Sequence, residues 1–343
     1  MSAGMDDATL QKILAAYGIA GAQFFGVQKG YRNSSHHIVT DNGEHLNLIV
    51  YKSEPGILER IRRINQIGDI LAAQDFPARQ TYDNRILQLQ TGKTRINPTY
   101  AGLYQYLPGE TIPWEAYTMK HLKLLGKTMG DMHAKLQSAS SSPEIPTVTD
   151  EYSAILRRMQ RYFDDTAVRQ AMSAKLSVQL DKGIIKTLTR LVEEVCTRLP
   201  GQQPLHMDFV RGNILFTQTP GPDGLGNMEP PRITGVLDFE KVATGHPVFD
   251  IARTYSFLLV DCKYKSEDKV RKYFLHSGYH KYSQSPFKLN AWHTALLKEL
   301  TTMFLLYDFY KFLCHTPYEY LNQNEHYTRT RHILLQRGII HKI

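Results

Sequence analysis

The sequence predicts an α+β protein of two lobes, in which a small N-terminal antiparallel sheet with one helix precedes a larger, mainly helical C-terminal lobe. The length of 343 residues exceeds that of a typical single domain. Strand-like segments gather in the first part of the chain, and helical periodicity dominates from Trp114 onward. We therefore place an N-terminal lobe over residues 1–107, a linker over 105–110 and a C-terminal lobe over 108–343.

The N-terminal elements follow from local pattern. Residues 21–53 alternate in the manner of strands, and the segment TDNG at 40–43 predicts a hairpin turn because Asn-Gly tolerates positive φ. Apolar residues recur every three or four positions over 57–71, which indicates the buried face of a helix. Two further strands are expected at 84–92 and 99–107.

The C-terminal lobe is expected to be helical over 114–199 and again over 250–343. Two strand-like pieces interrupt it, at 204–216 and 232–245. The segment between them is rich in Pro and Gly, which is typical of an irregular excursion.

Composition narrows the function classes. Hydrophobic content of 42% predicts a sizeable core, and the polar, acidic N-terminus does not resemble a signal peptide. No apolar run reaches 18 residues, and the three cysteines lack metal-ligand or disulfide-frame spacing. The net charge of +8 is dispersed without a basic tract, which favours a solvated surface over nucleic-acid binding. We expect a cytoplasmic protein, monomer or homodimer, that binds neither nucleic acid nor membrane.

The segment PLHMDFVRGNILF at 204–216 carries the chemistry. Three polar residues lie on a mostly apolar stretch, and burying them is costly unless each has a partner. His206-x-Asp208 with Asn213 five positions later has the spacing of a phosphotransferase catalytic loop, in which the aspartate accepts the hydroxyl proton and the asparagine binds magnesium. Asp238 ends a second apolar run, GVLDFE, where a carboxylate can reach the same metal.

The two motifs, LHMDFVRGNILF and GVLDFEKVATGHPVFDIAR, together resemble the active-site pair of the aminoglycoside phosphotransferase and choline kinase superfamily. The resemblance implies a bilobal protein-kinase-like fold and transfer of the γ-phosphoryl group from ATP to a hydroxyl, with ATP and Mg²⁺ as cofactors. It assigns Asp208 as the catalytic base, Asn213 and Asp238 as magnesium ligands, and His206 as a brace for the loop. Asp250 we expect to be a structural acceptor at a helix start.

The same resemblance implies a nucleotide site in the first lobe. Lys52 follows a strand, where the family places the lysine for the α- and β-phosphates, and Glu59 on the next helix is expected to pair with it in preference to Glu54. The loop over the phosphates is expected to include Gly30, Asn33, Ser34 and Ser35. Adenine is expected against the linker backbone at Gln105, Tyr106 and Leu107.

The acceptor stays open between an antibiotic and a metabolite such as an amino alcohol, a sugar or homoserine. From Thr244 onward the chain has 14 Lys and Arg against 8 Asp and Glu, which argues against a polycationic aminoglycoside. Arg211, also assigned to the catalytic set, is expected to contact either the transferring phosphoryl group or an anionic acceptor. The alternatives are a protein kinase-like enzyme, which the short return to a helix after Asp238 disfavours, and a catalytically silent nucleotide-binding module.

Overall fold

The structure is a computed structural model of the whole chain. It describes residues 7–29, 33–89, 98–113, 116–137, 139, 145–199, 201–217, 230–281 and 290–343. The chain forms two compact units, of which the first comprises Met1–Glu110 with Thr234–Glu240 and the second comprises Thr111–Ile233 with Lys241–Ile343.

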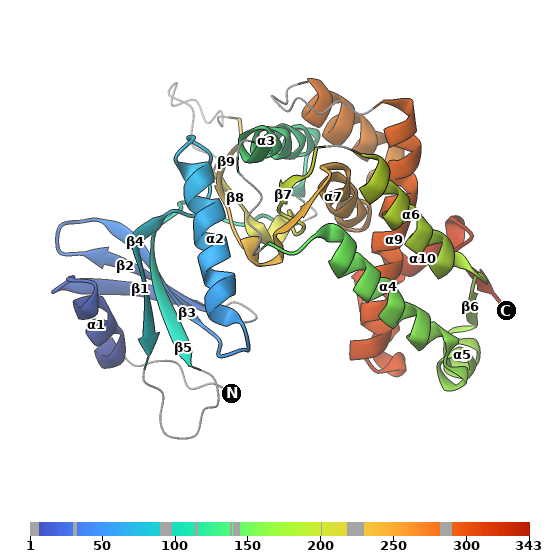
Figure 1. Cartoon of the computed structure of the whole chain (residues 1–343), viewed down its shortest axis with the longest axis horizontal. Coiled ribbons are helices and arrows are strands. Elements are labelled where there is room, and N and C mark those ends of the chain that lie inside the picture. Colours follow the sequence, from blue (N-terminus) through green and yellow to red (C-terminus); the bar gives the residue numbers. More distant parts are fainter. Residues whose placement is uncertain are drawn as a thin grey trace. The chain divides into compact units, whose positions relative to one another are not determined.

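The first unit is built on a five-stranded antiparallel sheet (Figure 1). Its strands, in spatial order, are β1 (Ala22–Lys29), β2 (Ser34–Thr40), β3 (His45–Tyr51), β5 (Thr99–Gln105) and β4 (Thr81–Leu89). The predicted hairpin joins β2 to β3, and Gly43 takes the positive φ of 81° that the turn requires.

Two helices cover opposite faces of this sheet. Helix α1 (Asp7–Ala16) packs Leu10 and Leu14 against Leu48, and α2 (Ile57–Ala72) packs Ile61 against Tyr51. Leu48 and Tyr51 lie on opposite faces because side chains alternate along β3. The expectation of a single helix in this lobe is therefore wrong: α1 is only ten residues long, and its three buried residues gave too weak a periodic signal.

The second unit is mainly helical, as expected. Its long helices are α3 (Met119–Gln137), α4 (Val148–Asp164), α6 (Ile184–Arg198), α7 (Val248–Asp261), α9 (Ala291–His315) and α10 (Glu325–Gln336). Its shorter helical segments are α5 (Thr166–Ala171), η2 (Met172–Leu176), η3 (Arg211–Asn213), α8 (Glu267–Val270), η5 (Arg271–His280) and η6 (Tyr318–Gln323).

Among the described residues, the strands outside the large sheet form three pairs. They are β7 (Gln203–Leu205) with β10 (Ala243–Gly245), β8 (Ile214–Thr217) with β9 (Arg232–Val236), and β6 (Val178–Leu180) with β11 (Ile340–Lys342). The last pair lies in stretches that the sequence predicts to be helical, because three-residue strands carry no detectable period. The β7–β10 pair matters most for function, since it sets Leu205 opposite Ala243 and brings the two motif segments together.

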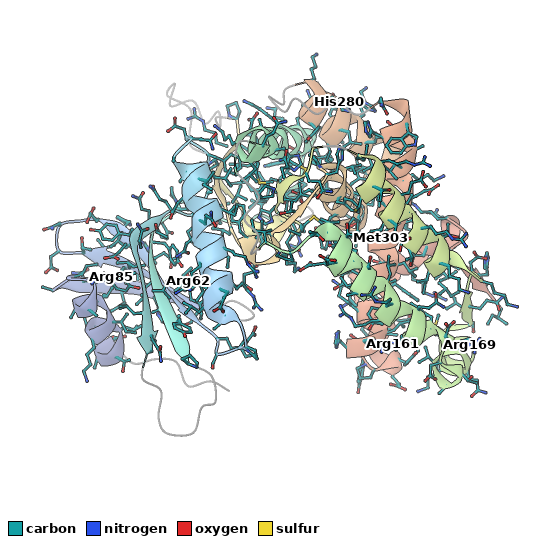
Figure 2. The ribbon with its side chains drawn as sticks, viewed as in Figure 1. Arg62, Arg85, Arg161, Arg169, His280 and Met303 are labelled. Carbon is teal, nitrogen blue, oxygen red and sulfur yellow. The ribbon has the colours of Figure 1, made fainter. Side chains whose placement is uncertain are left out.

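Packing in the second unit is centred on α7 and α9. Nearly every residue of α7 is buried, and α9 buries Met303, which Figure 2 labels, and Phe304. Gly126 on α3 is required by close helix packing, because a Cβ there would lie 2.1 Å from the carbonyl oxygen of Phe274 on η5. No described helix is both long and apolar enough to cross a membrane.

Basic residues are spread over the molecule. The labelled side chains of Arg62 on α2 and Arg85 on β4 in the first unit, and of Arg161 on α4 and Arg169 on α5 in the second, are all exposed and stand on separate elements (Figure 2).

Candidate active site

The loop between β7 and β8 is anchored by the carboxylate of Asp250 in the first turn of α7. Its Oδ2 accepts the backbone N–H of His206 and its Oδ1 accepts that of Met207, both at 2.9 Å. The Nε2 of His133 lies 3.1 Å from the same carboxylate, which is fully buried. Burial raises the pKa of Asp250, but the hydrogen bond and charge of His133 and the contacts with His206 outweigh it, and the net shift is downward. Asp250 is thus a structural acceptor, as expected, and its partner is the loop itself.

The loop backbone is strained and closely tied. Met207 has a φ of 58°, a conformation that costs a non-glycine residue about 1 kcal/mol or more and that persists where surrounding contacts impose it. Those contacts include Thr254, whose hydroxyl donates to the carbonyl of Phe209 at 3.0 Å. The Nδ1 of His206 accepts the N–H of Asp208 at 3.2 Å.

Asn213 closes the loop from its other end. Its Nδ2 donates to the carbonyl of Asp208 at 2.9 Å. The amide oxygen makes no hydrogen bond to any residue that the structure describes, so this oxygen is the part of the side chain that can bind a cation.

Lys241 is a site residue that sequence reasoning missed. Its Nζ lies 2.8 Å from Oδ2 of Asp208, whose side chain is only 12% exposed. The contact follows from the β7–β10 pairing, because Lys241 comes two positions before β10 and Asp208 three positions after β7. In the sequence, the only indication of this role is that Lys241 lies close to Asp238 in the second motif.

A buried arginine also acts on Asp208. Arg253 on α7 makes a two-pronged ion pair with Asp308 on α9, at 2.8 and 3.1 Å, and its guanidinium lies 4.0 Å from the ring centroid of Phe257. Burial lowers the pKa of Arg253, but the charge of Asp308 and, more weakly, that of Asp208 raise it by a larger amount. The net shift of the pKa is therefore upward. The guanidinium therefore stays charged and contributes a positive potential at the Asp208 carboxylate.

Arg211 is paired away from Asp208. Its Nε lies 3.5 Å from Oδ2 of Asp261, a nearly buried carboxylate at the end of α7. Asp261 also lies 3.4 Å from Nδ1 of His326 on α10. The arginine thus joins the catalytic-loop segment to the far end of the helix that holds the loop.

In the first unit, Lys52 and Glu59 do not form an ion pair. Lys52 directly follows β3 and is exposed, and no side-chain partner for it occurs among the described residues. Glu59 is exposed in the first turn of α2, because Ile57 and Ile61 take the buried face. Glu54, the alternative partner, instead pairs with Arg60 at 3.0 Å.

Asn33 joins two parts of the predicted nucleotide site. Its Oδ1 accepts the backbone N–H of Lys52 at 3.1 Å, and its Nδ2 donates to Oε1 of Glu240 at 2.8 Å. Glu240 lies two positions after Asp238, in η4 (Phe239–Lys241). The asparagine therefore links the end of β3 to the segment that carries the predicted metal ligand.

Asp238 itself has a φ of 62° and is half-buried. It follows β9, whose last residue, Val236, donates its N–H to the carbonyl of Pro77 at 2.6 Å. The carboxylate of Asp238 lies in the field of Arg79, which stacks 4.5 Å from the ring centroid of Tyr104. A left-handed aspartate held in place by strand pairing is typical of a functional position.

Two of the remaining residues predicted to contact the nucleotide already make side-chain hydrogen bonds within the protein. The hydroxyl of Ser35 donates to Asn47 at 2.7 Å, and that of Ser34 lies 3.2 Å from a ring nitrogen of His36. Gly30 lies outside the described residues.

At the linker, the backbone N–H groups of Gln105 and Tyr106 donate to Gln80 and His45. The N–H of Leu107 has no partner among the residues that the structure describes. Of the three positions, Leu107 is therefore the one with a main-chain donor left for a base.

The sequence matches a family model described as the phosphotransferase enzyme family over residues 26–273. A search of curated proteins found no match. Among solved structures, an amicoumacin kinase, hAmiN, in complex with AMP-PNP, Ca²⁺ and Ami is 12% identical, with a TM-score of 0.67 and coverage of 98% of this chain and 95% of that one.

Two further solved structures are similar over nearly the whole chain. A microcompartment-associated aminopropanol kinase is 16% identical, with a TM-score of 0.69 and coverage of 97% and 99%. A choline kinase from Cryptosporidium parvum Iowa II is 13% identical, with a TM-score of 0.57 and coverage of 97% and 98%. At these identities the structures establish the fold, and the α+β, kinase-like architecture expected from the sequence is confirmed.

Proposed function

The chain belongs to the phosphotransferase enzyme family, and from this premise we propose that it transfers the γ-phosphoryl group of ATP to a hydroxyl of a small molecule. The observation that carries the proposal is the state of Asp208. Its carboxylate sits on a loop held by Asp250, Thr254 and Asn213, and it faces the cation of Lys241. A base that must meet one hydroxyl proton needs such a fixed position.

The step is a direct displacement. The acceptor oxygen forms a bond to the γ-phosphorus, the bond to the departing ADP oxygen breaks, and the hydroxyl proton passes to the carboxylate of Asp208. Lys241 would neutralise charge on the transferring group, since its side chain is 55% exposed and its Nζ lies 2.8 Å from Asp208.

Magnesium would be held by Asn213 and Asp238. Both offer oxygen donors, which Mg²⁺ prefers, and the engaged Nδ2 of Asn213 leaves its oxygen for the metal. When bound, the ion neutralises phosphate charge. The protein would position the two oxygen donors: the loop positions Asn213, and strand β9 positions Asp238.

We assign nucleotide binding to the first unit and the catalytic loop and acceptor to the second, in line with lobes over 1–107 and 108–343. Lys52 would meet the α- and β-phosphates, Asn33 and the segment from Gly30 would cover them, and Leu107 would meet adenine. The resemblance that implies these roles also places Glu59, Ser34, Ser35 and Gln105 near the nucleotide.

The acceptor is proposed to be a metabolite such as an amino alcohol, a sugar or homoserine, in preference to an antibiotic. The similar structures are named as kinases of amicoumacin, of aminopropanol and of choline, at identities too low to choose among acceptor classes. Against a protein kinase, α7 begins at Val248, so only a short segment follows Asp238. A cytoplasmic location stays a prediction from the sequence.

The test is ADP release from Mg²⁺-ATP across a panel of hydroxyl acceptors, which would hold choline, ethanolamine, homoserine, thiamine, methylthioribose, aminoglycosides and macrolides. Acceptor-dependent release supports the proposal and identifies the substrate class. ATP binding without release on any acceptor would favour the silent nucleotide-binding module instead.

A further inference from the structure

The second unit contains a cavity of about 590 Å³, and no described residue of the proposed site lines it. Its walls come from the end of α7, the turn that follows it, the start of α8, the first half of α9 and the last turns of α10. A volume of this size is that of a small-molecule site.

The charged lining of this cavity is one-sided. Five cationic side chains face it, and Glu267 is the one carboxylate among its described lining residues. The cations are Lys263, Lys265, Lys298, Arg329 and Arg337.

Ion pairs neutralise two of the five. Arg337 lies 2.8 Å from Oε1 of Glu267, and Lys263 pairs with Glu325 on α10. For Lys265, Lys298 and Arg329 the described part of the chain supplies no ion pair. The Nε of Arg329 is moreover buried and has no hydrogen-bond partner among the residues that the structure describes. Three cations without an ion pair in the described structure, Lys265, Lys298 and Arg329, therefore line one cavity.

The walls are fixed before any ligand arrives. Arg337 donates to the hydroxyl of Thr302 at 2.8 Å and to the carbonyl of Lys298 at 3.1 Å, which ties α10 to α9. Arg329 reaches the carbonyl of Leu259, which ties α10 to α7. A preformed concave site with like charges concentrates its field on an anion.

We propose that this basic cavity is a binding site for a small, multiply charged phosphate compound, separate from the proposed active site. Like charges gathered in a hollow repel one another, and an anion with two or more charges relieves that repulsion. Arginine and lysine side chains are the usual donors to phosphate oxygens. Ser266 and Gln336, which also line the cavity, add neutral hydrogen-bonding groups. The cavity is sized for a small molecule.

Isothermal titration with inorganic pyrophosphate and tripolyphosphate tests the proposal, at constant ionic strength and with sulfate as a comparison anion. The test variant is Lys265→Gln with Lys298→Gln, because neither side chain has an ion pair to lose within the described structure. The matched control is Lys182→Gln with Lys186→Gln, two exposed lysines elsewhere in the same unit. Lys52→Ala removes a phosphate contact at the proposed nucleotide site.

Saturable binding is expected in the wild type, with about tenfold or greater weakening in the test variant, because two charge-assisted contacts are lost. The control variant is expected to bind as the wild type does, Lys52→Ala is expected to keep the binding that the test variant weakens, and sulfate is expected to bind more weakly than pyrophosphate. Three results would overturn the proposal: no saturable binding, equal weakening in the control variant, or loss of binding only in Lys52→Ala. Melting curves for each variant verify that the fold is intact.

Discussion

The ammonium of Lys241 lies 2.8 Å from the carboxylate of Asp208, joining two motifs that are far apart in the sequence. The lysine side chain is half-exposed and the aspartate side chain is nearly buried, so the lysine is the member of the pair that contacts solvent. The buried guanidinium of Arg253, which is ion-paired with Asp308, also interacts electrostatically with Asp208. Two cations, Lys241 and Arg253, therefore act on the proposed base, and both supply positive charge near its carboxylate.

Lys241→Ala is expected to lower kcat by about tenfold or more, because the lysine neutralises charge at the reacting centre. Steady-state ADP release measures this. The control is Lys175→Ala, which removes an exposed ion pair to Glu319 at 2.9 Å and is expected to leave kcat unchanged. Equal kcat in Lys241→Ala and wild type would show that the ion pair has no catalytic part.

Asp250→Asn is expected to destabilise the protein by about 3 kcal/mol and to lower kcat as well. The asparagine has a single acceptor oxygen, so one of the N–H groups of His206 and Met207 would lose its buried partner. Urea unfolding measures the stability, and Asp164→Asn at an exposed position of α4 is the control. A variant as stable as the control would mean that the loop does not depend on this carboxylate.

How much of this site the sequence predicts depends on the range of each contact. The order and type of the main elements, and the motif spacing from Asp208 to Asn213, are local properties, and the hairpin at Gly43 and helix α2 were predicted correctly. The loop's anchoring by Asp250 is a pairing across more than 40 positions, and only the position of that aspartate at a helix start could be predicted.

The other gaps have the same cause. Lys241 reaches Asp208 only because β7 pairs with β10, and strands of three residues leave no periodic signal. In the sequence, Arg253 and Asp308 look like ordinary helix residues. Their ion pair is evident only from the packing of α7 against α9. The Lys52–Glu59 pair was expected from resemblance, but the helix face that buries Ile57 and Ile61 turns Glu59 to solvent.

His246 should make stability depend on pH between 7 and 5. Burial, and then the neighbouring His293 and His133, lower the pKa of His246 to about 4. An unfolded histidine titrates near 6.5, so below that pH the unfolded chain binds a proton that the folded protein excludes, and stability falls as pH falls. Between pH 7 and pH 5, His246 therefore lowers the free energy of unfolding by about 2 kcal/mol.

The variant for this prediction is His246→Asn, whose amide oxygen can still accept the N–H of Val248 as Nδ1 does. Urea unfolding should show that the free energy of unfolding falls between pH 7 and pH 5 by about 2 kcal/mol less in this variant than in the wild type. His315→Asn, at an exposed position at the end of α9, should keep the wild-type loss. An unchanged loss in His246→Asn would contradict the assignment.

Lys52→Ala is expected to raise the KM for ATP by about tenfold or more while leaving the KM for the acceptor near its wild-type value, because its ammonium is assigned to the nucleotide phosphates. The backbone N–H that Asn33 accepts is retained in the variant. Lys12→Ala on α1 serves as the control. Unchanged ATP kinetics would transfer the role to another lysine, with Lys29 the first to test.

The most direct test of the central claim is the kcat of Asp208→Asn with the best acceptor, measured beside the dissociation constant for Mg²⁺-ATP. The substitution keeps the shape of the side chain and removes its capacity to take a proton. We predict a kcat lowered by about 100-fold or more, as loss of a general base implies, with nucleotide affinity nearly unchanged. A variant that turns over as fast as the wild type would contradict the assignment of Asp208 as the base.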